Sequence, residues 1–164
     1  MKSGTQILPL RQAVMLGVFL AVCLGSGAVG SVVTTPQIPT WYASLSKPPW
    51  NPPSWVFAPV WSTLYVMMSV AAWLVWKEVG TLRGRGFLWF WIQLILNASW
   101  SFIFFGLKQP GWAFAEIVLL WLSIAATLWM FRRYSSLAAL LLAPYLGWVT
   151  FAAYLNFAIW RLNP

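Results

Sequence analysis

The sequence predicts an all-α integral membrane protein: a five-transmembrane-helix bundle with a Pro/Trp-rich loop between the first and second helices. Hydrophobic residues make up 61% of the chain and charged residues 7%, whereas about 25% of the residues in a soluble domain are charged. A bilayer core about 30 Å thick requires about 20 apolar residues per helix. Five runs meet this requirement: 13–33, 55–76, 87–107, 112–131 and 137–160. Because the remaining segments are short, we expect residues 1–164 to form a single domain.

The first run is compatible with two interpretations. It follows the basic residues Lys2 and Arg11 and ends in small residues, as a signal peptide does. However, residues 13–33 carry no charge over 21 positions, which is long enough to span a bilayer. We therefore favour a retained transmembrane helix.

Small residues recur every four positions along this first helix, at Gly17, Ala21 and Gly25. Such spacing lets two helix backbones approach closely. The pattern predicts that this face packs tightly against another helix, either within the chain or across a dimer.

The basic residues predict an orientation in the membrane. Seven of them fall on the side of the N-terminus and of the second and fourth loops: Lys2, Arg11, Lys77, Arg83, Arg85, Arg132 and Arg133. The opposite side carries only Lys47, Lys108 and Arg161. This asymmetry predicts a cytoplasmic N-terminus in a bacterial cell membrane, with an outer membrane or an organelle membrane as alternatives. The net charge of +8 indicates contact with anionic lipid, and no nucleic-acid-binding motif accompanies it.

Few side chains are available for polar catalysis. The chain has no histidine, and its only acidic residues are Glu78 and Glu116. These counts argue against a histidine metal site and a Ser-His-Asp triad, so we expect no metal and no obligatory cofactor. Cys23 is the single cysteine and cannot form an internal disulfide. Glu116 lies inside the fourth apolar run, where a charge is costly, so we predict an ion pair with Lys108 or Arg161.

The segment 34–53, between the first two helices, is rich in proline and aromatic residues. Its six prolines restrict the backbone and predict a stiff, folded-over loop: Pro36, Pro39, Pro48, Pro49, Pro52 and Pro53. Trp41, Tyr42 and Trp50 lie between them. Because such rings suit the membrane interface, the loop is either an interfacial aromatic belt or a lid over a cavity between helices.

Five sequence blocks carry a dense pattern of tryptophan and proline. They read WYASLSKPPWNPPSW at 41–55, PVWSTLY at 59–65, QLILNASWS at 93–101, PYLGW at 144–148 and LNFAIWR at 155–161. Together they resemble the translocator protein family, also called the tryptophan-rich sensory protein or peripheral-type benzodiazepine receptor family. The resemblance covers nearly the whole chain, and the number of helices matches.

The resemblance implies a five-helix bundle, usually a homodimer in bacteria, with a ligand pocket beneath the first loop. It implies binding of porphyrins such as protoporphyrin or haem, and also of sterols and benzodiazepine-like drugs. By position, the pocket residues are Tyr42, Trp50, Asn51, Trp61, Tyr65, Asn97, Ser101, Trp148 and Ala152. The expected function is a membrane receptor or sensor that modulates porphyrin handling. Two alternatives remain: an enzyme that degrades porphyrin by light-dependent oxidation through Trp61 and Trp148, and a porphyrin transporter.

The residues themselves support part of this expectation. Trp61 and Tyr65 lie four positions apart, so on a helix they share one face and form an aromatic wall. Asn97 lies deep in a span, where its amide either bonds a neighbouring helix or contacts the ligand. Without histidine, a strong iron ligand is lacking, which favours metal-free porphyrin or haem held without one. Phe157 replaces the tyrosine of a common sterol motif, which weakens the expectation of sterol binding.

Overall fold

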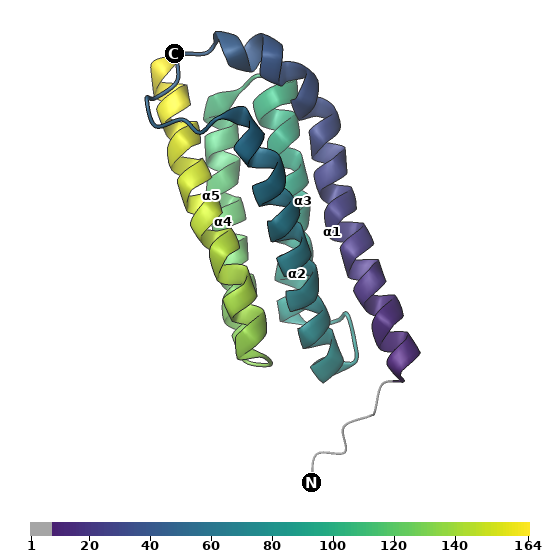
Figure 1. The fold of residues 1–164 in the computed structure, drawn as a ribbon. Helices are drawn as coiled ribbons and strands as arrows, with labels where there is room; N and C mark the ends of the chain where they lie inside the picture. Colours follow the sequence, from purple (N-terminus) through teal and green to yellow (C-terminus); the bar gives the residue numbers. More distant parts are fainter. Residues whose placement is uncertain (1–7) are drawn as a thin grey trace.

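The computed structural model describes residues 8–164 and confirms the all-α fold. Its five long helices are α1 (Pro9–Gln37), α2 (Phe57–Val79), α3 (Arg85–Ser101), α4 (Pro110–Arg132) and α5 (Ser136–Leu162). With the short helical turns that extend some of them, all five are long and apolar enough to cross a membrane. They run side by side as a bundle (Figure 1). The predicted basic residue Lys2 lies outside the described residues.

The first helix extends further than the sequence predicts. We expected a loop from residue 34, but α1 continues to Gln37 and then through a π-helical turn, η1 (Ile38–Tyr42). Pro36 removes one backbone donor from α1, and the wider turn that follows accommodates such a defect. Figure 1 shows the end of this helix bending across the end of the bundle. A shorter loop then returns to α2 through a 3₁₀ turn, η2 (Ser54–Val56).

The helices form a closed ring in which α1 contacts α2, α2 contacts α5, α5 contacts α4, α4 contacts α3 and α3 contacts α1. The α1 helix is the least buried of the five. A π-helical turn, η3 (Phe102–Gly106), extends α3 at the same end of the bundle as η1. A ring of five helices surrounds a central space, and side-chain size decides where that space is filled.

Aromatic rings fill the centre of the ring at the end where α1 begins. Phe19 of α1 lies 6.1 Å from Phe87 and 6.0 Å from Phe90, between ring centroids. Phe131 of α4 closes the group at 5.6 Å from Phe87. All four side chains are almost fully buried. Dense packing at this end leaves space for a cavity only toward the end that carries the loop.

Basic side chains surround this densely packed end. Arg11 lies over the ring of Trp76 at 5.5 Å, and Lys77 lies over Trp73 at 4.4 Å. Arg133, at the end of α4, lies over Trp129 at 4.3 Å. These cation–π contacts hold positive charge beside tryptophan, as at a membrane interface.

The small residues of α1 divide between two faces. A Cβ added to Gly27 would clash with the ring of Tyr65, and one added to Gly30 would lie 2.9 Å from Ser101 Oγ. These glycines therefore permit close approach to α2 and α3. Gly17 and Gly25 face open space, so the predicted tight packing of their face does not occur within the described chain. Packing of that face across a dimer stays a prediction.

A chain of hydrogen bonds connects three helices in the interior. The hydroxyl of Tyr65 donates to Asn97 Oδ1, and Asn97 Nδ2 donates to the hydroxyl oxygen of Tyr145 at 2.8 Å. Tyr145 in turn donates to Gln93 Oε1 at 2.9 Å. The interhelical role considered for Asn97 is therefore confirmed. These bonds satisfy polar groups that would otherwise be unpaired in an apolar interior.

Replacing Tyr145 with Phe should destabilise the bundle, because it leaves Asn97 and Gln93 with unpaired buried groups. We expect a loss of about 1–3 kcal/mol in the free energy of unfolding, measured by denaturation in mixed micelles. Tyr154→Phe is the control, since Tyr154 is exposed. Equal stability of the two variants would contradict a supporting role for the hydrogen-bond chain.

Candidate ligand-binding cavity

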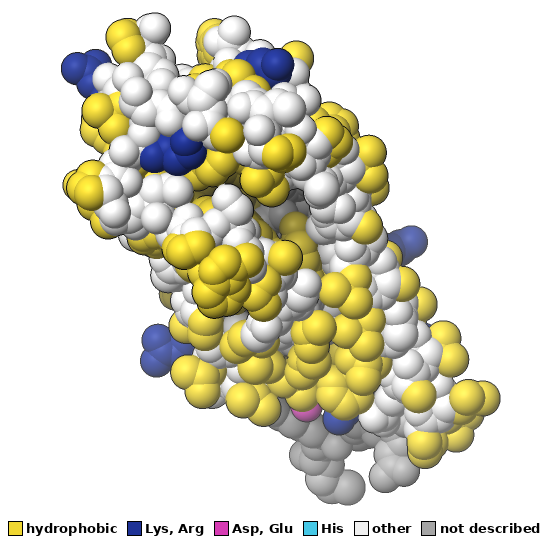
Figure 2. Space-filling view, turned by 45° about the horizontal axis from the view of Figure 1, so that its top comes forward, with side chains coloured by type: hydrophobic (Ala, Val, Ile, Leu, Met, Phe, Trp, Pro, Cys, Tyr) yellow, Lys and Arg dark blue, Asp and Glu magenta, His cyan; other side chains and the backbone are white. Residues whose placement is uncertain are grey.

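A cavity of about 460 Å³ occupies the bundle toward the loop end, with walls from all five helices. Figure 2 shows the surface turned so that this end comes forward, with a hollow that has hydrophobic side chains inside it. Volumes between about 300 and 1,000 Å³ are typical of small-molecule sites. The bundle therefore contains a cavity of the size that a drug-sized or larger planar molecule requires.

Seven of the nine residues predicted for a pocket line this cavity. They are Tyr42, Trp61, Tyr65, Asn97, Ser101, Trp148 and Ala152. The structure thus brings together positions from α1 with η1, α2, α3 and α5. Trp50 and Asn51, which we also expected in the pocket, do not line it.

Trp50 instead attaches the loop to the outer side of α5. Its ring stacks on Tyr154, with centroids 5.0 Å apart and planes at 11°, and meets Phe151 edge-on at 5.9 Å. Tyr154 is 62% exposed, and so belongs to the surface of α5. Trp50 lies outside the cavity lining because the loop crosses the outside of α5 before it reaches α2.

Asn51 supports the wall of the cavity from behind. Its Oδ1 accepts a hydrogen bond from the hydroxyl of Tyr42 at 2.8 Å, and its Nδ2 donates to the carbonyl of Pro52 at 3.1 Å. Tyr42 packs against Phe105 at 5.7 Å, between ring centroids. Asn51 therefore positions Tyr42, while Tyr42 itself closes the cavity.

The loop is also fixed to the last residues of α5. The backbone N–H of Ser46 donates to Asn163 Oδ1 at 3.0 Å, and Asn163 Nδ2 donates back to the carbonyl of Ser46 at 2.9 Å. The amide side chain of Asn163 thus pairs with both the backbone N–H and the backbone carbonyl of Ser46. The two contacts tie the loop to the helix whose other residues line the cavity.

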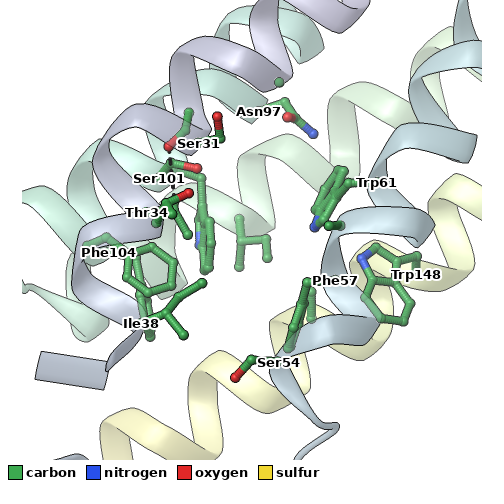
Figure 3. A pocket seen from close by; sticks show the side chains of 18 of the residues that line it. Ser31, Thr34, Ile38, Ser54, Phe57, Trp61, Asn97, Ser101, Phe104 and Trp148 are labelled. Atoms are coloured by element: carbon green, nitrogen blue, oxygen red, sulfur yellow. Dashed lines mark hydrogen bonds between the residues drawn. The ribbon is translucent and has the colours of Figure 1, made fainter. Parts of the chain in front are cut away.

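The α2 and α5 side of the cavity is aromatic and carries an unpaired donor. Trp61 lies 5.7 Å from Tyr65 and 6.1 Å from Tyr145, between ring centroids. Figure 3 shows Trp61 and Trp148 together on one side of the space. Within the described chain, Nε1 of Trp148 is buried and has no hydrogen-bond partner. A buried N–H of this kind is costly unless a ligand or water supplies an acceptor.

The described lining contains no lysine, arginine, aspartate or glutamate. Its polar groups are hydroxyls, amides and indole N–H groups, distributed among apolar and aromatic side chains. Because an unpaired charge is strongly disfavoured in such surroundings, the walls suit an uncharged, flat part of a ligand.

The predicted ion pair of Glu116 is wrong. Glu116 is buried and does not line the cavity. Its Oε1 accepts from Ser99 Oγ at 3.0 Å, while Oε2 has no hydrogen-bond partner among the described residues. Lys108 and Arg161 are exposed. Position on the same side of the membrane was therefore insufficient to bring either cation to the carboxyl group.

Comparison with known proteins agrees with the geometry. The TspO/MBR family profile matches residues 19–161. The chain belongs to the TspO/MBR family. It is 45% identical over 160 residues to the tryptophan-rich protein TspO of Chlorobaculum tepidum, covering 94% of this chain and 99% of that protein. It is 43% identical over 151 residues to the translocator protein of Homo sapiens, covering 90% and 89%.

A third relative is the tryptophan-rich sensory protein of Cereibacter sphaeroides, 40% identical over 145 residues, with 88% of this chain and 89% of that protein covered. Family membership and the five apolar helices make the chain an integral multi-pass membrane protein. The resemblance that the Trp/Pro blocks suggested is thereby confirmed.

Several residues that line the cavity of this TspO/MBR protein were not predicted from the sequence. On α1 and at the start of η1 they include Gly27, Ser31, Thr34 and Ile38. These positions are four, three and four residues apart, which places them on one face of a helix. This spacing is visible in the sequence, but most of the first helix is apolar, and the residue pattern does not show which face of the helix lines a cavity.

Removing the amide of Asn163 should loosen the loop. We expect Asn163→Ala to accelerate amide hydrogen exchange of the loop peptide containing Ser46, because both hydrogen bonds to that residue are lost. Mass spectrometry of peptides from residues 43–53 measures this change. The control is Arg161→Ala, at an exposed position on the same helix end. Unchanged exchange in Asn163→Ala would show that other contacts hold the loop.

Proposed function

We propose that this TspO/MBR protein is a membrane receptor or sensor that binds a protoporphyrin-type tetrapyrrole in the cavity and modulates porphyrin handling. The main support is the buried, unpaired N–H of Trp148 at the wall of an uncharged aromatic cavity. The family and the names of its relatives, which include translocator protein and tryptophan-rich sensory protein, support a sensor or receptor role in the membrane.

The chemistry of a tetrapyrrole fits these walls. A porphyrin is a flat aromatic plate, and flat rings gain from stacked and edge contacts with tryptophan and tyrosine. Trp61 and Tyr65 supply such a surface on α2, and Trp148 supplies one on α5. The π face of the macrocycle, a weak hydrogen-bond acceptor, would face Trp148 Nε1. The same walls suit other flat apolar guests, and we extend the proposal to sterols and benzodiazepine-like drugs.

The acidic arms of a porphyrin would lie outside the cavity. Since the described lining has no cation, a carboxylate placed within it would be unpaired. Lys47 lies in the loop and covers the ring of Tyr42 at 5.0 Å. The arms would therefore point toward the loop end, where water, headgroups and Lys47 are accessible.

Haem would bind without a strong iron ligand. Cys23 is buried and does not line the cavity. The tyrosines at the wall, Tyr42 and Tyr65, already donate their hydroxyl protons to Asn51 and Asn97. We therefore propose metal-free porphyrin, or haem held by its ring alone, as the ligand.

The orientation belongs to the same proposal. Arg11, Lys77 and Arg133 lie at the end of the bundle away from the cavity, each against a tryptophan ring. The positive-inside rule then puts that end in the cytoplasm. The cavity opens toward the opposite face of the membrane.

Replacing Trp148 with Phe should weaken porphyrin binding about two- to tenfold, because it removes the N–H that faces the macrocycle and keeps an aromatic ring. The measurement is titration of the purified protein with protoporphyrin, followed by its absorption spectrum. Trp129→Phe is the control, since Trp129 faces the outside beside Arg133. If the two variants bind with the same affinity, the cavity is not the porphyrin site.

Light-dependent oxidation of porphyrin is a second candidate function, favoured by the position of Trp61 and Trp148 on one side of the cavity. This activity predicts that bound protoporphyrin loses absorbance under illumination faster than the pigment in detergent alone. The double variant Trp61→Phe, Trp148→Phe should lose that acceleration. Photobleaching at the detergent rate in the wild type would exclude the enzyme and leave the receptor function intact.

A further inference from the structure

Two groups of polar side chains lie on opposite sides of the cavity. Figure 3 shows the hydroxyls of Ser31, Thr34 and Ser101 gathered on one side and the indoles of Trp61 and Trp148 on the other. Ser31 and Thr34 belong to α1, and Ser101 is the last residue of α3. We refer to Ser31, Thr34 and Ser101 as the hydroxyl cluster. The indole side offers N–H donors, so the chemistry of the opposite side decides what a ligand must present there.

Two members of the hydroxyl cluster have already used their protons. Ser31 Oγ donates to the carbonyl of Ala28 at 2.8 Å, and Thr34 Oγ1 donates to the carbonyl of Gly30 at 3.0 Å. A hydroxyl has one proton and two lone pairs. While these bonds are kept, Ser31 and Thr34 can only accept a further hydrogen bond, and each lines the cavity.

Ser101 is held beside them by close packing. A Cβ on Gly30 would lie 2.9 Å from Ser101 Oγ, so a larger residue at this position would require the Ser101 hydroxyl to move. The carbonyl that Thr34 bonds also belongs to Gly30. One glycine thus brings the hydroxyls of two helices to the same part of the wall.

We propose that the hydroxyl cluster is a subsite for a hydrogen-bond donor on the periphery of the ligand, an O–H or N–H group on the side away from the indoles. This inference rests on the proposed porphyrin binding and specifies it further. The inner N–H groups of a porphyrin point to the centre of the macrocycle and cannot reach a wall. A peripheral hydroxyl substituent can.

The cluster also disfavours one orientation of the ligand. An ionised carboxylate is only an acceptor, and two of the three hydroxyls can offer it no proton. An acidic arm placed against Ser31 and Thr34 would therefore bring its carboxylate oxygens against the lone pairs of the two hydroxyl oxygens, and the contact would be repulsive. The subsite therefore selects a donor substituent for the part of the ligand that contacts it.

Two porphyrin esters that differ only in peripheral hydroxyls test the subsite. Protoporphyrin dimethyl ester carries two vinyl groups, and haematoporphyrin dimethyl ester carries two hydroxyethyl groups in their place. Both have the same macrocycle and neither has a charged arm. The ratio of their dissociation constants, measured by absorption titration in one detergent, isolates the contribution of the hydroxyls.

We expect Thr34→Val, and Ser31→Ala combined with it, to weaken binding of the hydroxylated ester about two- to tenfold relative to the vinyl ester. Thr34→Val preserves the shape of the side chain, and any effect on the cavity as a whole would change the affinity for both esters equally and cancel in the ratio. The control is Thr63→Val on α2, since Thr63 also donates to its own helix, at Pro59, but does not line the cavity.

The outcomes separate this inference from the proposed function. A ratio that is the same in wild type, Thr34→Val and Thr63→Val would overturn the subsite while porphyrin binding stands. Parallel weakening of both esters in Thr34→Val would also overturn it, because the residue would then act on the cavity as a whole. Failure of both esters to bind the wild type would overturn the proposed function together with the subsite.

Discussion

The open cavity depends on how the buried polar side chains satisfy one another in an apolar environment. Tyr65, Asn97, Tyr145 and Gln93 form one continuous hydrogen-bonded chain across α2, α3 and α5. Because hydrocarbon offers these groups no alternative partner, their bonds fix the relative positions of three helices. Tyr65 and Asn97 are also part of the cavity lining. Toward the end of the bundle where α1 begins, the rings of Phe19, Phe87, Phe90 and Phe131 fill the interior. These rings limit the depth of the cavity.

The wall that α1 forms is attached to its neighbours in a different way from the walls of α2, α3 and α5. The α1 helix is the least buried, and it approaches its neighbours closely at Gly27 and Gly30, where a side chain would collide with Tyr65 or Ser101. Its far end bends at Pro36 and η1 to bring Tyr42 over the cavity. Hydrogen bonds to backbone carbonyls also join α1 to its neighbours: Ser69 Oγ and Trp73 Nε1 of α2 donate to the carbonyls of Phe19 and Gln12 at 3.1 and 2.9 Å, and Ser26 Oγ donates to the carbonyl of Leu94 on α3 at 3.4 Å. The low burial of α1 makes this helix and its extension the part of the bundle best suited to adjust to a ligand.

The sequence predicted the fold because hydropathy and span length are imposed by the bilayer, independently of packing. It also predicted Trp61 and Tyr65 together, since four residues on a helix place two side chains on one face. It failed where the outcome depends on the path of the chain in three dimensions. Trp50 stacks on the outside of α5, and proline did not end α1 where a helix-breaking rule expects it. The ion pair expected for Glu116 required distances that a shared membrane side does not imply. Ser31 and Thr34 went unnoticed because hydroxyls in apolar helices commonly bond their own backbone, and only packing shows which of them face a void.

The distribution of charge explains how a cavity without charged residues could accept a ligand with acidic arms. In the described part of the chain, every lysine and arginine lies outside the cavity lining. A porphyrin plate gains apolar contact by entering, while its carboxylates lose hydration with no cation to compensate them. The balance favours one orientation, with the plate inside and the arms at the loop end. The cavity would therefore select by the placement of polar groups around a flat molecule, and a ligand with charges on opposite edges would be excluded by the same energetics.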